Sequence, residues 1–510
     1  MAFEDSQQNS MLRALTSLFL LASLTSCGTE GQELSPAQFE ELRAQFRSYL
    51  TDTGVPSFAV GAAKDGKIIW AEGFGYANKE RRIPASASTM YSVGSISKPM
   101  TATAVMLLAE RGLIDLNKPA NMYLPPPGLR AFAGAAEDAT VKRIMHQTAG
   151  LPMYWHFYKG DAGNRPIPEQ IAQRFGILTS TPGERYEYSN LGYSLLATIV
   201  ERVTRGSFPE FMRKEIFEPL GLTRTAIFVE PPDADSVAPR YLGKGEISPF
   251  YDYHLRGASA VYASVHDLLR FGMFHLKNHL ADQKQIVSTK SIEAMQEATD
   301  PKLPRSRYKI GWDVGERFGY DVVTHGGGMP GVRSMLLLLP AENITVAVVS
   351  NGESAVLPRI YDPVLAALLP DYGEKWRKQS AGQEPPRPGT FAPPDQLIGD
   401  WIGKIVTYKE TIPVELSCKR DGSVAFIVRP NTADSKYVTD LAGTPRIQGG
   451  LFIANFRTQI PMEEAGTAAA TTYLKVKLGD AVMSGMALAV CEKETFALPS
   501  YVELIRKKPQ

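Results

Sequence analysis

Cysteine, long apolar runs and blocks of like charge are all scarce in this sequence of 510 residues. Its three cysteines are too few and too scattered for a disulfide framework, and no CxxC or HExxH motif signals a metal site. Lys and Arg number 55 against 54 Asp and Glu, so a net charge of +1 offers no field to attract nucleic acid or an anionic membrane. The hydrophobic and charged fractions are those of a soluble globular protein. We therefore expect no nucleic-acid partner, no metal and no cofactor.

An apolar stretch in residues 11–27 is too short to span a bilayer comfortably and predicts a signal peptide. Arg13 precedes the apolar residues, and the ending before Cys27 resembles a bacterial lipobox, in which the cysteine is lipidated and becomes the mature N-terminus. Because residues 1–10 are acidic, we expect the true start at Met11. The alternative is a plain secretory signal with an incidental cysteine. In both cases we expect export to the periplasm or cell surface, and in the first case a lipid anchor is the only membrane contact that we expect.

Residues 36–378 carry helix and strand patterns that predict one α+β domain. An amphipathic helix opens the domain, and two strands joined at Asp65-Gly66 follow as a hairpin. Residues 100–112 are apolar on nearly every face, which favours a helix in the middle of the domain. Strand patterns return at residues 320–354, so we expect one sheet that joins the two ends of the domain, with helices between them.

The remainder of the chain has a different composition. Residues 28–35 predict a flexible tether, and the prolines of residues 379–396 predict a stiff linker. Residues 397–510 alternate apolar and polar positions with frequent turns, which predicts a small all-β barrel or sandwich, with a lipocalin-like barrel as one form of it. Cys418 and Cys491 both fall there, and the sequence leaves open whether they pair after export.

The stretch Ser95-Ile96-Ser97-Lys98 places a hydroxyl and an amine one helical turn apart, directly before the apolar helix. Pro99 is tolerated in a first helical turn, so Ser95 is expected at the helix N-terminus, where free N–H groups favour a developing oxyanion. Burial of Lys98 there would favour the neutral amine that accepts a proton. A second match, Ser306 to Lys309, precedes no apolar helix and is the weaker candidate.

Two further motifs follow along the chain: Tyr188-Ser189-Asn190 and His325-Gly326-Gly327. With the serine–lysine stretch, they resemble the three active-site motifs of the penicillin-binding serine hydrolases, which include class C β-lactamases, D,D-peptidases and related esterases. Flanking stretches such as "HQTAGLP", "TPGERYEYSNLGYSLLATIVE" and "HGGGMPGVRS" resemble family segments in the family's order. The resemblance covers about residues 38–355 and implies a β-lactamase/transpeptidase-like domain, with an antiparallel sheet and an all-helical subdomain.

The resemblance also implies a role for each motif residue. Ser95 would be acylated, while Lys98 and Tyr188 would share the proton transfers, and which of them is the base in acylation stays open. Asn190 would bind the substrate amide and Lys98. The backbone N–H groups of Ser95 and Gly328 would form the oxyanion hole.

The third motif, His325 with Gly326 and Gly327, would line the substrate. Relatives with lysine at the first position offer a permanent charge to a substrate carboxylate, whereas histidine is only partly charged near neutral pH. The histidine therefore favours peptidases and esterases over a dedicated β-lactamase. If His325 holds an anionic substrate, kcat/KM is expected to fall as pH rises through about 6.5.

Three functions stay open at this point. The first is an exported serine hydrolase that acts on an amide, a β-lactam or an ester, with a D-amino-acid peptide or carboxylic ester favoured. The second is a catalytically silent protein that keeps the fold to recognise a peptide. The third places the function in the β domain as a ligand binder. The expected partner is a small-molecule or peptide substrate, and the oligomeric state is left open.

Overall fold

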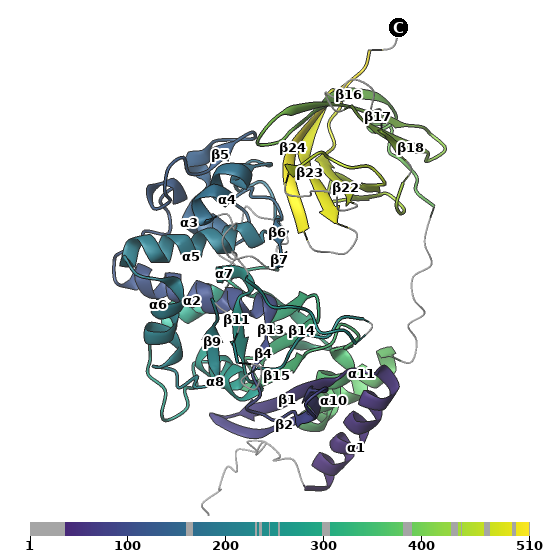
Figure 1. The fold of residues 1–510 in the computed structure, drawn as a ribbon. Coiled ribbons are helices and arrows are strands. Elements are labelled where there is room, and N and C mark those ends of the chain that lie inside the picture. Colours follow the sequence, from purple (N-terminus) through teal and green to yellow (C-terminus); the bar gives the residue numbers. More distant parts are fainter. Residues whose placement is uncertain are drawn as a thin grey trace, which may run out of the picture.

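The computed structural model describes most of the chain from residue 36 onward (Figure 1). The described residues are 36–159, 167–229, 232–233, 237–243, 245–252, 256–297, 307–380, 390–429, 437–439, 441–463, 470–491 and 496–508. The predicted signal peptide, the lipidation site at Cys27 and the tether 28–35 lie outside them, as do residues 381–389 of the proline-rich linker. The described chain forms a region of helices and sheet up to Ser380, followed by a region of β-strands.

A seven-stranded antiparallel sheet is the centre of the first region, in the order β12-β13-β14-β15-β1-β2-β3. Its strands are β1 (Ser57–Lys64), β2 (Lys67–Asn78), β3 (Ile83–Pro84), β12 (Asp313–Arg317), β13 (Tyr320–Met329), β14 (Val332–Leu339) and β15 (Ile344–Ser350). β1 pairs with β15, with Val60 opposite Val348, so the two ends of the region meet within one sheet, as predicted. The hairpin between β1 and β2 turns at Asp65 and Gly66, whose φ angles of 49° and 75° are those that an Asp-Gly turn supplies.

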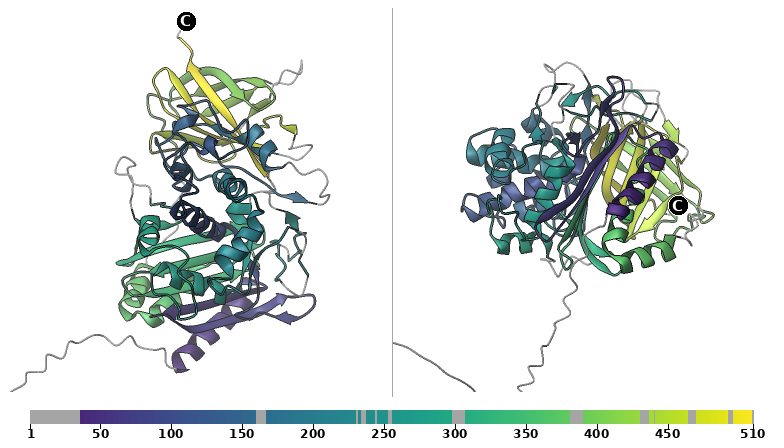
Figure 2. Two further views of the ribbon diagram at one scale, coloured as in Figure 1. Left: turned by 90° about the vertical axis from the view of Figure 1, so that its left-hand side faces the viewer. Right: turned by 90° about the horizontal axis from the view of Figure 1, so that it is seen from below.

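Helices cover both faces of this sheet (Figures 1 and 2). The described helices are α1 (Pro36–Thr53), α2 (Ser97–Glu110), α3 (Val141–Met145), α4 (Pro168–Phe175), α5 (Asn190–Thr204), α6 (Phe208–Met212), α7 (Arg256–Ser259), α8 (Val265–His275), α9 (Thr289–Gln296), α10 (Pro358–Leu368) and α11 (Pro370–Ser380), with the shorter turns η1 (Gly94–Ile96), η2 (Ala120–Met122), η3 (Ala136–Asp138) and η5 (Arg213–Phe217). On one face α1, α10 and α11 share a core with Val60. On the other face α2, α5 and α8 share a core with Ala59.

Short strands connect the helical part. They are β4 (Tyr91–Ser92), β9 (Thr225–Ile227) and β11 (Val261–Ala263) in one sheet, the parallel pair β5 (Arg130–Ala131) and β8 (Ile177–Leu178), and the antiparallel pair β7 (Tyr158–Lys159) and β10 (Tyr251–Asp252). β4 leads directly into η1 and α2, so this small sheet fixes where the serine–lysine stretch begins.

The apolar helix predicted from residues 100–112 is α2, and it lies in the interior as expected. All of its residues from Ser97 to Leu108 are buried. It ends where Gly112 adopts a φ of 71° and the N–H of Leu113 donates to the carbonyl of Leu108 at 3.0 Å. A glycine in the left-handed conformation is the usual end of a helix, because a side chain would be strained there.

The C-terminal region is one curled antiparallel sheet in the order β19-β18-β17-β16-β24-β23-β22-β21-β20 (Figure 1). Its strands are β16 (Gly399–Val406), β17 (Thr411–Cys418), β18 (Val424–Val428), β19 (Tyr437–Thr439), β20 (Arg446–Gln448), β21 (Leu451–Phe456), β22 (Ala470–Lys477), β23 (Val482–Cys491) and β24 (Phe496–Arg506). Burial alternates residue by residue along β17 and β22, so one face is core and the other faces outward. The predicted all-β region is confirmed.

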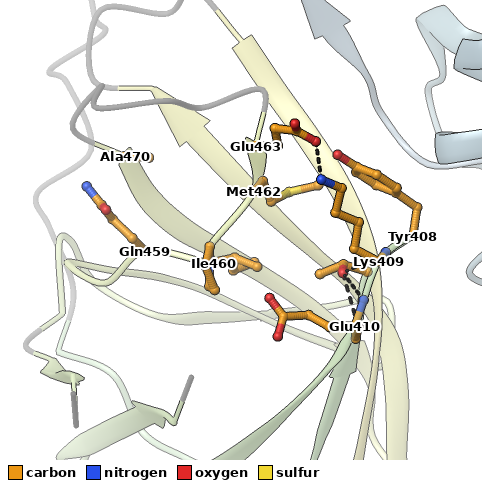
Figure 3. Close-up of a pocket in the computed structure, with 10 residues that line it drawn as sticks. Tyr408, Lys409, Glu410, Gln459, Ile460, Met462, Glu463 and Ala470 are labelled. Atoms are coloured by element: carbon orange, nitrogen blue, oxygen red, sulfur yellow. Dashed lines mark hydrogen bonds and ion pairs between the residues drawn. The ribbon is translucent and has the colours of Figure 1, made fainter. Parts of the chain in front are cut away.

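Large side chains fill the buried face of this sheet, among them Trp401, Phe426 and Phe452, none of which is exposed. Cys418 and Cys491 are buried, free thiols, so the disulfide left open by the sequence is not formed in this structure. A pocket of about 370 Å³ lies between the β16–β17 turn and residues 459–463, with Lys409 and Glu463 paired across it (Figure 3). None of the predicted catalytic side chains lines it.

The two regions are joined by strand pairing as well as by side chains. β6 (Trp155–His156), from the helical part, pairs with β24, with His156 opposite Phe496. Phe132 stacks on Tyr501 with ring centroids 4.9 Å apart. Across the part of the chain that the structure describes, no helix is both long and apolar enough to cross a membrane.

Candidate active site

Ser95 lies in η1, the single turn that runs directly into α2. The neighbouring Ser97 holds this turn in place, because its hydroxyl donates to the Gly94 carbonyl at 2.7 Å and accepts the N–H of Val261 at 3.1 Å. Ser334 on β14 donates to the carbonyl of Val93 at 2.7 Å. The Ser95 side chain is therefore presented, half-buried, from a turn that is fixed on both sides.

Lys98 reaches back from the first turn of α2 to Ser95 and is fully buried. Its Nζ lies 3.0 Å from Ser95 Oγ, 2.8 Å from Asn190 Oδ1 and 3.0 Å from the Ala258 carbonyl oxygen. Three acceptors would suit an ammonium group, but removal from water disfavours the charge. Burial accordingly lowers the pKa of Lys98 well below its usual value.

Tyr188 also contacts Ser95, with its hydroxyl 2.8 Å from Ser95 Oγ and its ring centroid 4.8 Å from Lys98 Nζ. It precedes α5, whose first residue is Asn190 and whose N-terminus is capped by the Ser189 hydroxyl, which accepts the Gly192 N–H at 3.0 Å. Burial raises the pKa of the Tyr188 phenol, and the hydrogen bond with Ser95 only partly opposes this, so the phenol is protonated at neutral pH.

A count of hydrogens shows which charge states fit this arrangement. If Lys98 is a neutral amine, its two hydrogens go to Asn190 Oδ1 and the Ala258 carbonyl, and its lone pair accepts the hydrogen of Ser95. Tyr188 then donates to the free lone pair of Ser95 Oγ. If Lys98 were charged, it would donate to Ser95 Oγ, and the Ser95 hydrogen could go only to the phenol oxygen of Tyr188, in place of the hydrogen bond that Tyr188 donates to Ser95. A neutral amine keeps the hydrogen bond from Tyr188 and is already placed to take the proton of Ser95.

The glycines of β13 let the strand pass close to the Ser95 turn. A Cβ atom on Gly327 would lie 2.0 Å from the Val93 carbonyl oxygen, so no larger residue fits there. Gly94, with a φ of 52°, would carry a Cβ 3.2 Å from the backbone nitrogen of Gly328. The segments that carry the N–H groups of Ser95 and Gly328, predicted to form the oxyanion hole, are thus in contact.

β12 pairs with one edge of β13 only as far as Thr324, which lies opposite Asp313. From His325 onward, that edge of β13 has no strand partner among the described residues, while β14 pairs with the other edge through Met329. An extended substrate could add its backbone to this free edge. Gly326 and Gly328 are exposed and Gly327 is buried.

His325 is buried, with 5% of its surface exposed, and both ring nitrogens have partners. Nδ1 lies 2.8 Å from the Gly326 carbonyl, to which it donates, and Nε2 lies 3.1 Å from the hydroxyl of Tyr308. Burial, and secondarily any positive charge on Lys98, lowers the pKa of His325 to about 3. The sequence-based expectation of a charge change near pH 6.5 at His325 is therefore wrong, because the sequence did not show how deeply the ring is buried.

A pH profile checks this correction. Between pH 5 and 8 His325 is expected to stay neutral, so kcat/KM of the wild type and of His325→Asn should depend on pH in the same way, whatever the difference in absolute rate. Asparagine is chosen because its side-chain amide can still donate near the Gly326 carbonyl. Loss of an ionisation near pH 6.5 in the variant alone would show that His325 titrates after all.

Tyr308 is a site neighbour that sequence reasoning missed. It belongs to the second serine–lysine match, which was set aside, and Ser306 of that match lies outside the described residues. The Tyr308 ring is nearly perpendicular to that of His325 at 5.7 Å and to that of Tyr188 at 6.2 Å. Only the fold brings these rings together, because the local sequence around Tyr308 shows no catalytic pattern.

No group of three or more His, Cys, Asp or Glu side chains in the described part of the chain is placed to hold a metal ion. The chemistry of the site is that of a hydroxyl between an amine and a phenol. The hydroxyl is the nucleophile of such a set, and the amine and phenol can each move a proton.

A serine and a lysine at the start of a buried helix, a tyrosine from a second segment and a glycine-rich strand edge are arranged in the order and proximity that the resemblance to the penicillin-binding serine hydrolases implies. The model of the family described as Beta-lactamase matches residues 42–370, and the chain belongs to this family. The resemblance found in the sequence is thereby confirmed.

Relatives are found among both sequences and structures. "Protein flp" of Staphylococcus aureus (strain N315) is 26% identical over 316 residues, which cover 60% of this chain and 62% of that protein. "Penicillin-binding protein 4*" of Bacillus subtilis (strain 168) is 26% identical over 331 residues, covering 57% of this chain and 67% of that protein. The chain thus spans less than two thirds of the length of the flp protein.

Among solved structures, the octameric penicillin-binding protein homologue from Pyrococcus abyssi is similar with a TM-score of 0.57 and 24% identity. The similarity covers 91% of this chain and 99% of that one, so it extends beyond the family match into the C-terminal sheet. At this identity it shows a shared fold.

Proposed function

We propose that this protein is a serine hydrolase that forms an acyl-enzyme through Ser95. The observation that carries the proposal is the position of Ser95 Oγ, 3.0 Å from Lys98 Nζ and 2.8 Å from the Tyr188 hydroxyl. The substrate is an amide, a β-lactam or an ester, and a D-amino-acid peptide or carboxylic ester is favoured because His325 supplies no permanent charge. Export and lipid anchoring through Cys27 belong to the same proposal and rest on the sequence alone.

In the first half of the reaction Lys98 accepts the proton of Ser95 as Oγ attacks the substrate carbonyl carbon. The N–H groups of Ser95 and Gly328 stabilise the negative charge that develops on the carbonyl oxygen. Tyr188 donates its proton to the leaving group, which departs as the amine or alcohol, and the proton on Lys98 restores the phenol. Asn190 keeps Lys98 oriented throughout, through the contact of 2.8 Å.

In the second half a water molecule attacks the acyl carbon. It transfers a proton to the amine–phenol pair, and Ser95 Oγ leaves with a proton from the same pair. The net reaction is hydrolysis, and the site returns to its starting protonation state. The similarity to a Bacillus subtilis protein named as a penicillin-binding protein supports acylation by a β-lactam as one activity to test.

Two covalent probes test the proposal. The wild type is incubated separately with a fluorescent penicillin and with a fluorophosphonate, and the modified peptide is identified by mass spectrometry. Modification of Ser95 by both probes supports a penicillin-recognising hydrolase, and modification by the fluorophosphonate alone points to an esterase or aminopeptidase. Absence of modification by either probe would overturn the proposal and favour the catalytically silent alternative.

A further inference from the structure

Tyr188 is held by a segment that has no regular secondary structure. Residues 186–189 lie in neither a helix nor a strand, and α5 starts only at Asn190. The position of the Tyr188 hydroxyl therefore depends on what fixes this segment from outside. On one side Gln147 does so: its carbonyl accepts the Glu187 N–H and its side-chain oxygen accepts the Ser189 N–H, both at 2.8 Å.

On the other side Glu187 connects the segment to the C-terminal sheet. Its side chain is 5% exposed, and Oε1 lies 2.6 Å from Nζ of Lys475, 288 residues further along the chain. Lys475 belongs to β22, whose side chains alternate between core and outward positions, and it is one of the outward ones. Arg185 lies at a longer distance, 3.4 Å, from the other carboxylate oxygen.

The Tyr188 segment has a second connection to the C-terminal sheet, through Ser189. The Ser189 hydroxyl donates to the Pro152 carbonyl at 2.7 Å, and the chain then continues into β6, which pairs with β24. Glu187 and Ser189, the residues on either side of Tyr188, are thus both connected to the curled sheet, the first through Lys475 and the second through the segment that leads into β6. Of these two connections, the short and nearly buried ion pair of Glu187 is the more direct.

We propose that Glu187 and Lys475 are positioning residues, through which the C-terminal sheet sets the place of the Tyr188 hydroxyl at Ser95. This inference rests on the proposed function. It assigns the C-terminal sheet a part in catalysis without any contact to substrate. When the ion pair is removed, the fold persists through β6 and the aromatic contacts, but the Tyr188 segment is then held mainly from the Gln147 side and can shift away from Ser95. A displacement of about 1 Å at a reacting group can lower a rate by roughly 100-fold.

A second ion pair on the same strand provides a matched control. Lys477 lies two residues beyond Lys475 and pairs with Glu184 at 2.6 Å, but the two side chains are 60% and 24% exposed. Glu184 is also four residues from Tyr188 in the sequence, whereas Glu187 is adjacent. Lys477→Met removes the same charge from the same strand face and is expected to leave the reaction at Ser95 unchanged.

The test measures fluorophosphonate labelling of Ser95 at increasing probe concentration, which separates the maximal rate of labelling from the affinity for the probe. Lys475→Met is expected to lower the maximal rate by about 10- to 100-fold with little change in affinity. Lys475→Arg should restore most of the rate, and exchange of the pair, Glu187→Lys with Lys475→Glu, should restore part of it. Thermal unfolding and near-UV circular dichroism accompany each variant, and Lys475→Gln replaces the methionine variant if that one does not fold.

Equal labelling rates in the wild type, Lys475→Met and Lys477→Met would overturn the inference, as would an equal loss in both variants or a loss that Lys475→Arg does not reverse. A wild type that is not labelled at all would instead overturn the proposed function, and this inference with it. Labelling of the wild type therefore shows whether the proposed function fails or only the positioning role of Glu187 and Lys475.

Discussion

Ser95→Ala is expected to abolish covalent labelling and to lower kcat/KM for an activated ester by on the order of 10⁴-fold or more. The alanine removes the atom that bonds to the acyl group, and with it the oxygen that bridges Lys98 and Tyr188. Lys98 keeps its contacts with Asn190 and the Ala258 carbonyl, so little change in stability is expected. Hydrolysis of a 4-nitrophenyl ester and fluorophosphonate labelling measure the loss, and the unfolding temperature checks the fold.

The control is Ser92→Ala, because Ser92 is a buried serine three residues before Ser95 and points to Met329 rather than to Lys98. It is expected to keep labelling at Ser95. If Ser95→Ala hydrolysed the ester as fast as the wild type did, the acyl-enzyme would not form at this residue, and the proposed mechanism would have to be given up.

Several parts of the fold follow from local chemistry that the sequence displays directly. The Asp65-Gly66 turn needs two residues in the left-handed conformation, and few other pairs adopt it as readily. The helix α2 is apolar on nearly every face, and such a helix is typical of a protein interior. The alternation along β22 likewise predicts a strand with one buried face.

The candidate site was predictable only in part. Spacing within one helical turn relates Lys98 to Ser95, but no spacing rule relates either residue to Tyr188, which is 93 positions from Ser95. That link came from the resemblance to known motifs. The burial of His325 beside Tyr308 depends on strands and loops distant in the sequence, so the sequence alone did not show that burial lowers the pKa of this ring.

The contact between Glu187 and Lys475 was equally inaccessible from the sequence. Glu187 lies within a stretch that resembles a family segment, but Lys475 belongs to no recognisable motif, and their partnership depends on how the curled sheet docks on the helical part. A charged residue next to a motif tyrosine is ordinary in a surface loop, and only its 5% exposure and its short contact with Lys475 distinguish it.

The second large effect is expected for Lys98→Met, which should lower kcat/KM by roughly 10²- to 10⁴-fold, the usual contribution of a positioned acid or base. Methionine is similar in length and cannot accept the proton of Ser95, and it also ends the contact that orients Asn190. Lys98→Arg is the informative companion. It restores a cation, but arginine stays protonated, so it should remain as inactive as the methionine variant. Recovery in the arginine variant would mean that the positive charge, and not a neutral amine, is needed.

Lys98 should also make the free energy of unfolding depend on pH. Burial lowers the pKa of Lys98 in the folded protein below the 10.5 of the unfolded chain, so between these two values the unfolded chain binds the extra proton. The free energy of unfolding of the wild type should therefore rise with pH in that window, by at most about 1.4 kcal/mol per pH unit for one group.

Lys98→Met lacks this contribution, so the difference in unfolding free energy between the wild type and the variant should move in favour of the wild type from pH 7 to 9. Urea denaturation followed by tryptophan fluorescence at several pH values measures it, and Lys277→Met, at a lysine whose side chain is 39% exposed, is the control. A difference that stays constant over this range would mean that Lys98 keeps its ordinary pKa in the folded protein, and the neutral amine on which the proposed acylation step depends would lose its physical basis.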